Sequence, residues 1–179
     1  MTGTRPDLVL DTMCLAHFDR IDRLDVLGDL LSERQCWTTT AVREELRRGA
    51  GSGHEPGRVL DLLWLAVVPQ DEWDHIVAFS RWAQRIGATE HNIGEVTVFA
   101  AAEVLRAVAI TDDRNATAVA RTYGLTVHGT IWVLAQACQE AKLTETGAAN
   151  LVDMLRDSGM RLPCSGADFS AFARKQGIL

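Results

Sequence analysis

The chain has 179 residues, of which 47% are hydrophobic and 23% are charged, and this size and composition fit one globular domain with a sizeable core. Its formal net charge of −6 argues against a nucleic-acid-binding surface that is basic throughout, although a local basic region stays open. No apolar run approaches the ~18 residues of a membrane-spanning helix, and the N-terminus lacks the basic-then-apolar order of a secretory signal, so we expect a cytoplasmic protein without a membrane partner.

Short apolar runs alternate with helical patterns along most of the chain. Five runs predict strands, namely LVL at 8–10, CWTTTAV, residues 65–69, AVAIT and LTVHG. Helical patterns are found at 14–31, 42–49, 58–64, 74–85, 95–105, 114–124 and 130–141, with GAGSGHEPG as a loop. The alternation predicts an α/β fold, a three-layer α/β/α sandwich in which helices cover both faces of a parallel sheet of four to five strands.

The tail of the chain continues with helical patterns and no strand. Residues 150–156 and 168–176 are amphipathic, and the second pattern opens on the cap-like pair Ser165 and Asp168. No repeat or low-complexity linker precedes the tail. We therefore expect residues 1–142 to form the α/β domain and residues 143–179 to form a C-terminal helical extension packed on the same domain.

The cysteines and histidines do not have the spacing of a zinc site. The four cysteines are scattered without a C-x-x-C pair and are expected to be reduced and mostly buried: Cys14, Cys36, Cys138 and Cys164. The five histidines contain no H-x-x-x-H pair. Oxygen ligands are then the remaining way for this chain to hold a metal ion.

Acidic residues stand where several predicted strands and helices end or begin. Asp11 ends the first strand, Glu44 and Glu45 lie early in the helix after the second, and Glu95 opens a strongly apolar helix; Asp112 and Asp113 end the fourth strand. Each acid alone is explained by helix capping, which contributes ~0.3–1 kcal/mol. Ligands bind at the carboxyl ends of parallel strands, so all these acids would share one edge if the first and fourth strands are neighbours.

Carboxylates gathered at one edge repel one another unless a divalent cation neutralises them. Oxygen ligands without cysteine or histidine match Mg²⁺ or Mn²⁺. Such ions activate water and stabilise the attacking and leaving oxygens of a phosphodiester displacement. Hydrolysis of a nucleic-acid strand is therefore the chemistry that this arrangement favours.

Four motifs, in order and spacing, resemble the PIN-domain family of metal-dependent ribonucleases. They are VLDT at 9–12, VREEL at 42–46, GE at 94–95 followed by a helix of small residues, and TDD-x-x-A at 111–116. The resemblance covers most of the chain, and its later segments VHGTIWVLAQA and DSGMRLP are similar to a toxin-like prokaryotic subgroup. It implies that residues 1–142 are a PIN-like catalytic domain with Mg²⁺ or Mn²⁺ as cofactor and RNA as substrate. It also implies that the protein forms a homodimer, and it leaves open whether an antitoxin protein is a second partner.

The resemblance also implies roles for individual residues. The catalytic acids would be Asp11, Glu45, Glu95 and Asp113. The metal ligands would come from Asp11, Glu95, Asp113 and Asp112. Thr12, Thr111 and Glu44 would orient ligands or water. Glu45 is preferred over Glu44 because it directly precedes the leucine of the E-L pair, and Asp113 over Asp112 because the family pattern is T-x-D; both second choices stay open.

The chain departs from the family pattern in one place and carries one extra candidate. Met13 and Cys14 follow the D-T pair where the family often has a small hydroxyl residue. His91 lies one helical turn before Glu95 and could reach the site, although a lone histidine near a helix start is more often a surface or cap residue.

Other readings of the acids are weaker. A dinucleotide-binding fold needs G-x-G-x-x-G after the first strand, where this chain has DTMCLA. A phosphoryl-accepting receiver domain would carry a lysine after the fifth strand, which VHGT lacks, and a haloacid-dehalogenase-type phosphatase would carry D-x-D where Asp11 is followed by Thr12 and Met13. The serious alternative is a non-catalytic PIN-like module that binds RNA or a protein, and the complete acidic set favours catalysis over it.

Overall fold

A computed structural model describes residues 5–49, 59, 61–69, 71–90 and 92–179. Five strands form one parallel sheet in the order β3-β2-β1-β4-β5. The strands are β1 (Leu8–Leu10), β2 (Cys36–Thr38), β3 (Leu65–Val67), β4 (Val108–Ile110) and β5 (Val127–His128). All residues of β1 and β4 are buried, as expected for central strands covered on both faces.

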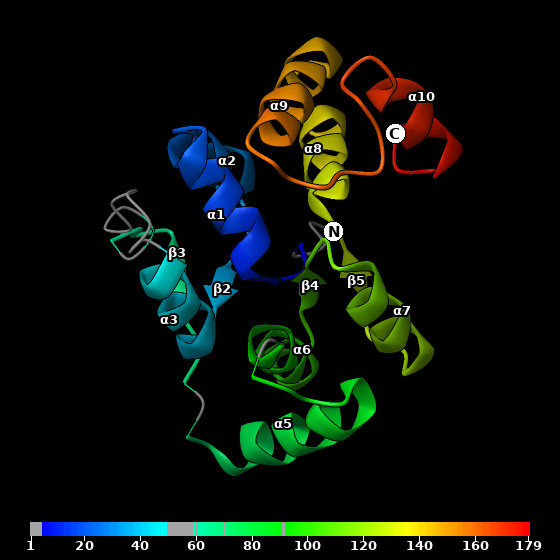
Figure 1. The fold of residues 1–179 in the computed structure, drawn as a ribbon. Coiled ribbons are helices and arrows are strands. Elements are labelled where there is room, and N and C mark those ends of the chain that lie inside the picture. The colour runs from blue at the N-terminus through cyan, green and yellow to red at the C-terminus, as the bar shows by residue number, and fades with distance from the viewer. Residues whose placement is uncertain (1–4, 50–58, 60, 70, 91) are drawn as a thin grey trace.

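Helices cover both faces of the sheet (Figure 1). They are α1 (Thr12–Arg20), α2 (Leu24–Leu31), α3 (Thr40–Gly49), α5 (Trp73–Ile86), α6 (Ile93–Leu105), α7 (Arg114–Thr122), α8 (Thr130–Gln139), α9 (Glu145–Asp157) and α10 (Phe169–Lys175). On one side α6 packs on β1 and β4 and is itself covered by α5. On the other side α1, α2 and α8 lie together, with α9 and α10 packed on α8. The three-layer α/β/α prediction is confirmed.

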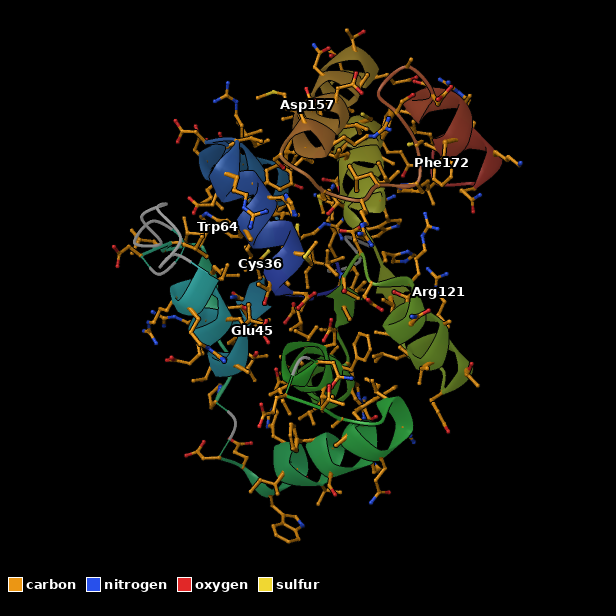
Figure 2. All side chains as sticks on the ribbon, viewed as in Figure 1. Cys36, Glu45, Trp64, Arg121, Asp157 and Phe172 are labelled. Atoms are coloured by element: carbon orange, nitrogen blue, oxygen red, sulfur yellow. The ribbon has the colours of Figure 1, made fainter. Side chains whose placement is uncertain are left out.

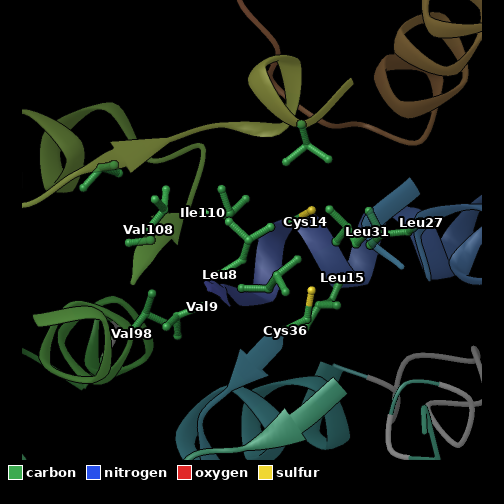
Figure 3. Packing of buried hydrophobic residues seen from close by; sticks show 14 of the residues in the cluster. Leu8, Val9, Cys14, Leu15, Leu27, Leu31, Cys36, Val98, Val108 and Ile110 are labelled. Atoms are coloured by element: carbon green, nitrogen blue, oxygen red, sulfur yellow. The ribbon is translucent and has the colours of Figure 1, made fainter. Parts of the chain in front are cut away.

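The centre of the core lies where β1 meets the flanking helices (Figure 3). Leu8 and Val9 of β1 are fully buried, and Cys14 and Leu15 of α1 pack on the same cluster. Burial raises the pKa of the Cys36 thiol to about 12, so this side chain behaves as a small apolar residue. All four cysteines are free, and three of them are buried.

Several predicted elements differ from the observed ones. The strand predicted over CWTTTAV ends at Thr38, because α3 already begins at Thr40. The predicted helix at 14–31 is two helices, because Asp22 adopts a left-handed conformation with φ 56° between α1 and α2. Helix α9 begins at Glu145 rather than near residue 150, and the Thr144 side chain caps it by accepting a hydrogen bond from Gly147 N at 3.0 Å. Residues 61–64, expected to end a helix, form turns instead, while the expected loop at 50–57 lies outside the described residues.

None of the helices in the described part of the chain is long and apolar enough to cross a membrane.

Candidate active site

The carboxyl ends of β1 and β4 lie side by side, and this adjacency brings the predicted acids together. In the register of the two strands Leu10 pairs with Ile110, so the residues that follow them, Asp11 and Thr111, leave the sheet at the same point. The Thr111 hydroxyl donates a hydrogen bond to Asp11 Oδ2 at 3.0 Å. Both residues are only 2% exposed. The condition on which the sequence prediction depended, that the first and fourth strands are neighbours, is therefore met.

Asp11 stands at the N-cap position of α1 but makes no capping hydrogen bond with its side chain. Its carboxylate is held instead by Thr111, inside the protein. Burial raises the pKa of Asp11 to about 7, and the charges of Glu95 and, more weakly, Glu45 act in the same direction. A capping role thus fails to account for this acid, and the neighbouring carboxylates show that it belongs to an acidic group.

Glu45 is fixed by residues from two other helices. Its Oε2 accepts a hydrogen bond from the Thr12 hydroxyl of α1 at 2.5 Å, and its Oε1 accepts one from the backbone N–H of Gly94 at the start of α6, at 3.1 Å. A side chain at position 94 would force the end of Glu45 to move, because a Cβ atom there would lie 2.6 Å from Glu45 Oε1. Figure 2 labels Glu45 on α3, the helix that supplies it.

Glu95 projects from the first turn of α6, a helix whose other residues up to Ala102 are almost all buried. Its carboxylate is half-buried. Burial raises the pKa of Glu95, and the negative charges of Asp113 and Glu45 raise it further. Glu95 and Asp113 also line one pocket of about 300 Å³ together with Asn92 and Asn115. The four expected catalytic acids therefore act on one another through their charges. Glu95 and Glu45 raise the pKa of Asp11, and Asp113 and Glu45 raise the pKa of Glu95.

Asp112 and Asp113 differ in what they bind. Asp113 is exposed and caps α7, since its Oδ1 accepts a hydrogen bond from Ala116 N at 2.6 Å. Asp112 reaches α8, where Thr130 donates to it from the backbone N–H at 3.0 Å and from the hydroxyl at 2.7 Å. Burial raises the pKa of Asp112, and the Thr130 bonds counter part of that shift. Asp112 thus connects β4 to α8, whereas Asp113 faces Glu95.

The remaining candidates lie apart from this group or outside the described residues. Glu44 is exposed and forms an ion pair with Arg47 on its own helix, so its side chain does not join Glu45. His91 lies outside the described residues.

Some residues of the site were not singled out from the sequence. Thr130 holds Asp112, and Gly129 is needed before it because a Cβ atom there would lie 2.5 Å from Asp112 Oδ1. Asn115 lines the pocket with Glu95 and Asp113. Thr130 and Gly129 fall within the VHGTIWV segment, and Asn115 follows TDDR, so their nearness to a motif was the available signal.

The donor set offers carboxylate and hydroxyl oxygens, which suit a hard divalent cation. Within the described ranges, however, no three histidine, cysteine, aspartate or glutamate side chains stand close enough together to hold a metal ion. The acids are near enough to perturb one another's pKa values but do not close around one point.

Comparison with known proteins agrees with this architecture. Residues 7–167 match the family model of the PIN domain. Among solved structures, the chain is similar to VapBC-1 from nontypeable Haemophilus influenzae, with a TM-score of 0.52 and 18% sequence identity over 68% of this chain and 96% of that chain. At this identity the similarity concerns the fold alone, and no curated protein matches the sequence. Because the family match spans nearly the whole chain, including the strand ends that carry the acids, the protein belongs to the PIN-domain family.

Proposed function

We propose that the protein is a metal-dependent endoribonuclease that hydrolyses RNA phosphodiester bonds in the cytoplasm. The observation that carries the proposal is the buried Asp11 carboxylate, whose pKa is raised to about 7 beside two further carboxylates. Burying an acid next to other acids costs stability, and such costs are concentrated at functional sites. Membership of the PIN-domain family supports nuclease chemistry for this acidic group.

The chemistry of the side chains fits Mg²⁺ or Mn²⁺. Asp11, Glu95 and Asp113 would hold the ion, with Asp112 as the second choice to Asp113, and all of them offer only oxygen. A divalent cation would remove the repulsion that now raises the pKa values of Asp11 and Glu95. When bound, the ion supplies an activated water and charge stabilisation at the phosphate. The side chains would have to move to gather three ligands around one ion, since the described residues do not hold three of them that close.

The protein's own groups have separable roles in this proposal. Asp11 is kept in place by Thr111, and Glu45 by Thr12 and Gly94, so both carboxylates are oriented before a substrate arrives. Glu95 and Asp113 line the open pocket and would meet the scissile phosphate and the attacking water. Of the two acids in the E-E pair, Glu45 would be catalytic and Glu44 at most a distant orienting group.

Two partners complete the proposal. The toxin-like motifs support a toxin role in which an antitoxin protein would cover the site. A homodimer is the expected assembly, and the exposed Trp73 and Ile76 on α5 offer apolar surface to bury. The helices of residues 143–179 would act as an extension packed on the catalytic domain.

The test is cleavage of a mixed pool of single-stranded RNA by the purified protein with Mg²⁺, with Mn²⁺ and with EDTA. Cleavage that requires the ion supports the proposal. If the protein cuts equally well in EDTA, the metal-dependent reaction is refuted. If it cuts under no condition and calorimetry detects no ion binding, the alternative of a non-catalytic PIN-like RNA- or protein-binding module is the better one, and the lack of three gathered ligands is the observation that favours it.

Glu45→Gln should lower metal-dependent cleavage by about ten- to a hundredfold, whereas Glu44→Gln should leave it unchanged. The two substitutions remove the same charge from neighbouring positions, but only Glu45 contacts α1 and α6. Initial cleavage rates with Mn²⁺ measure the difference. Equal losses in both variants would contradict the assignment of Glu45.

Gly94→Ala should reduce cleavage by about ten- to a hundredfold although it removes no acid. The new methyl group would lie within 2.7 Å of both Glu45 carboxylate oxygens, and the flexible end of Glu45 must move away. Because alanine favours a helix over glycine by about 1 kcal/mol, the fold should not lose stability. Cleavage rates measure the expected loss of activity, and urea unfolding curves measure the expected unchanged stability. A fully active variant would show that the position of Glu45 is unimportant.

A further inference from the structure

We propose that Arg114, Arg156 and Arg161 bind the phosphates of the RNA strand as it passes from the acidic group toward the C-terminal helices. The inference rests on the proposed function and assigns the substrate path at that same site. The three arginines line one cleft of about 1110 Å³, whose other lining residues include Asp112 and Asp113. The cleft therefore borders the proposed catalytic acids at Asp113 and extends from there to the end of α9.

The cleft is built from distant parts of the sequence. Arg114 is the first residue of α7, Arg156 lies in the last turn of α9, and Arg161 follows that helix. Figure 1 shows α9 and α7 on opposite sides of β5 and α8, and Figure 2 labels Asp157 at the end of α9 that borders the cleft. Two of the three basic groups thus come from the end of α9 and the residues that follow it, beyond the acid-bearing strands.

The turn that ends α9 fixes the position of the Arg161 backbone. Gly159 adopts a left-handed conformation with φ 93°, which reverses the chain, and the Met160 backbone N–H donates to Leu155 O at 3.1 Å. Met160 itself is buried, so it anchors the turn in the core while its neighbour Arg161 stays exposed. The DSGMRLP segment carries no proposed catalytic acid, and its role in this proposal is to supply Arg161 to the cleft.

These three guanidinium groups have no ion pair or hydrogen bond within the described part of the protein. Most other basic side chains do: Arg34 pairs with Glu140, Arg81 with Glu103 and Arg174 with Glu145. The cleft thus collects arginines that keep all their donors available. A planar guanidinium matches a phosphate with two parallel hydrogen bonds, which makes it the side chain of choice for a nucleic-acid backbone.

Four aspartates also line the cleft; three of them accept hydrogen bonds from backbone or hydroxyl groups, whereas Asp157 is exposed and follows Arg156 in the sequence. Asp112 accepts hydrogen bonds from Thr130, and Asp153 accepts one from Gly166 N at 2.7 Å. Asp113 caps α7 by accepting a hydrogen bond from Ala116 N. The three arginines supply the positive charge and the hydrogen-bond donors that a polyanion would meet in the cleft, beside four aspartates and in a chain with a net charge of −6.

The experiment measures binding of a fluorescently labelled single-stranded oligouridylate to the full-length protein in EDTA, where no metal-dependent cleavage occurs. Arg114→Gln, Arg156→Gln and Arg161→Gln should each weaken binding by about three- to tenfold at low salt. Each should also lower the slope of log affinity against log salt concentration by about 0.7, as one phosphate contact to a single strand is lost. The matched control is Lys175→Gln, which removes an exposed cation on α10 outside the cleft and should leave binding unchanged.

The outcomes separate this inference from the proposed function. Weaker binding in the three cleft variants but not in the control supports the path, even if the protein cuts no RNA with any ion and the nuclease proposal fails. If all three variants bind the oligonucleotide with the affinity and salt slope of the wild-type protein, the proposed RNA path is refuted, even if metal-dependent cleavage is found. Equal loss in the Lys175 variant, or no binding by the wild-type protein, would overturn it as well. Circular dichroism confirms that each variant is folded.

Discussion

Asp11→Asn should reduce metal-dependent RNA cleavage by about a thousandfold or more while the protein remains folded. Asp11 is the most deeply buried of the proposed ligands, and an amide neither carries the charge nor binds the ion as a carboxylate does. The asparagine oxygen can still accept the hydrogen bond that Thr111 donates, so the local structure has no reason to change. Cleavage rates with Mn²⁺ measure the loss. Asp25→Asn, which removes an exposed acid of α2, is the control and should be fully active.

The same substitution should stabilise the protein when no metal is present. The pKa of Asp11 is about 7 in the folded state and 3.8 when the carboxyl is fully hydrated, so between these values the folded protein keeps a proton that the unfolded chain has released. The free energy of unfolding therefore falls as pH rises from about 4 to about 7, by up to about 4 kcal/mol. Asparagine does not titrate, and the variant should lose most of this dependence.

Urea unfolding in EDTA between pH 5 and about 8 measures this effect. The Asp11→Asn protein should be the more stable at the upper end of the range, and the difference should shrink toward acid pH. Mn²⁺ should stabilise the wild-type protein at neutral pH but not the variant, because binding to the folded state alone shifts the unfolding equilibrium. A variant that cuts RNA at the wild-type rate would refute the role of Asp11, whatever its stability.

The sheet and the edge that carries the acids could be predicted because both follow from simple patterns. Fully buried apolar runs such as 8–10 and 108–110 indicate central strands of a parallel sheet, and parallel strands put their carboxyl ends at the same edge. The choice of Glu45 also has a physical basis in the sequence. Glu45 lies three residues after the buried Val42 and directly before the buried Leu46, which places it at the border of the inward face of α3.

The rest of the site depends on contacts between distant residues. Asp11 and Asp113 occupy equivalent N-cap positions, yet only Asp113 caps its helix, and the difference comes from Thr111 on the neighbouring strand. The partner of Asp112 lies eighteen residues further on, in α8. Arg114 and Arg161 line one cleft only because the residues that follow α9 border the same cleft as the start of α7. The secondary-structure propensity of a local segment does not predict any of these contacts between residues that are distant in the sequence.

The sequence leaves Asp112 and Asp113 as alternative ligands. Replacing Asp112 by alanine should mainly reduce stability, whereas replacing Asp113 by alanine should mainly abolish cleavage. Asp112→Ala should lower the free energy of unfolding by about 2–3 kcal/mol, because the buried Thr130 loses the acceptor of both its backbone N–H and its hydroxyl. Asp113→Ala should cost only about 1 kcal/mol, the loss of one helix cap, but should abolish cleavage.

Conservative variants separate structure from catalysis at these two positions. Asp112→Asn keeps an oxygen that can accept from Thr130 and removes a charge that burial disfavours, so it should remain close to wild type in both stability and cleavage. Asp113→Asn keeps the oxygen that caps α7 and should retain stability while losing cleavage. Urea unfolding and Mn²⁺-dependent cleavage of the four proteins test the scheme. If Asp112→Asn is stable and inactive while Asp113→Asn cuts RNA normally, Asp112 is the ligand, and α8, through Thr130, orients it directly.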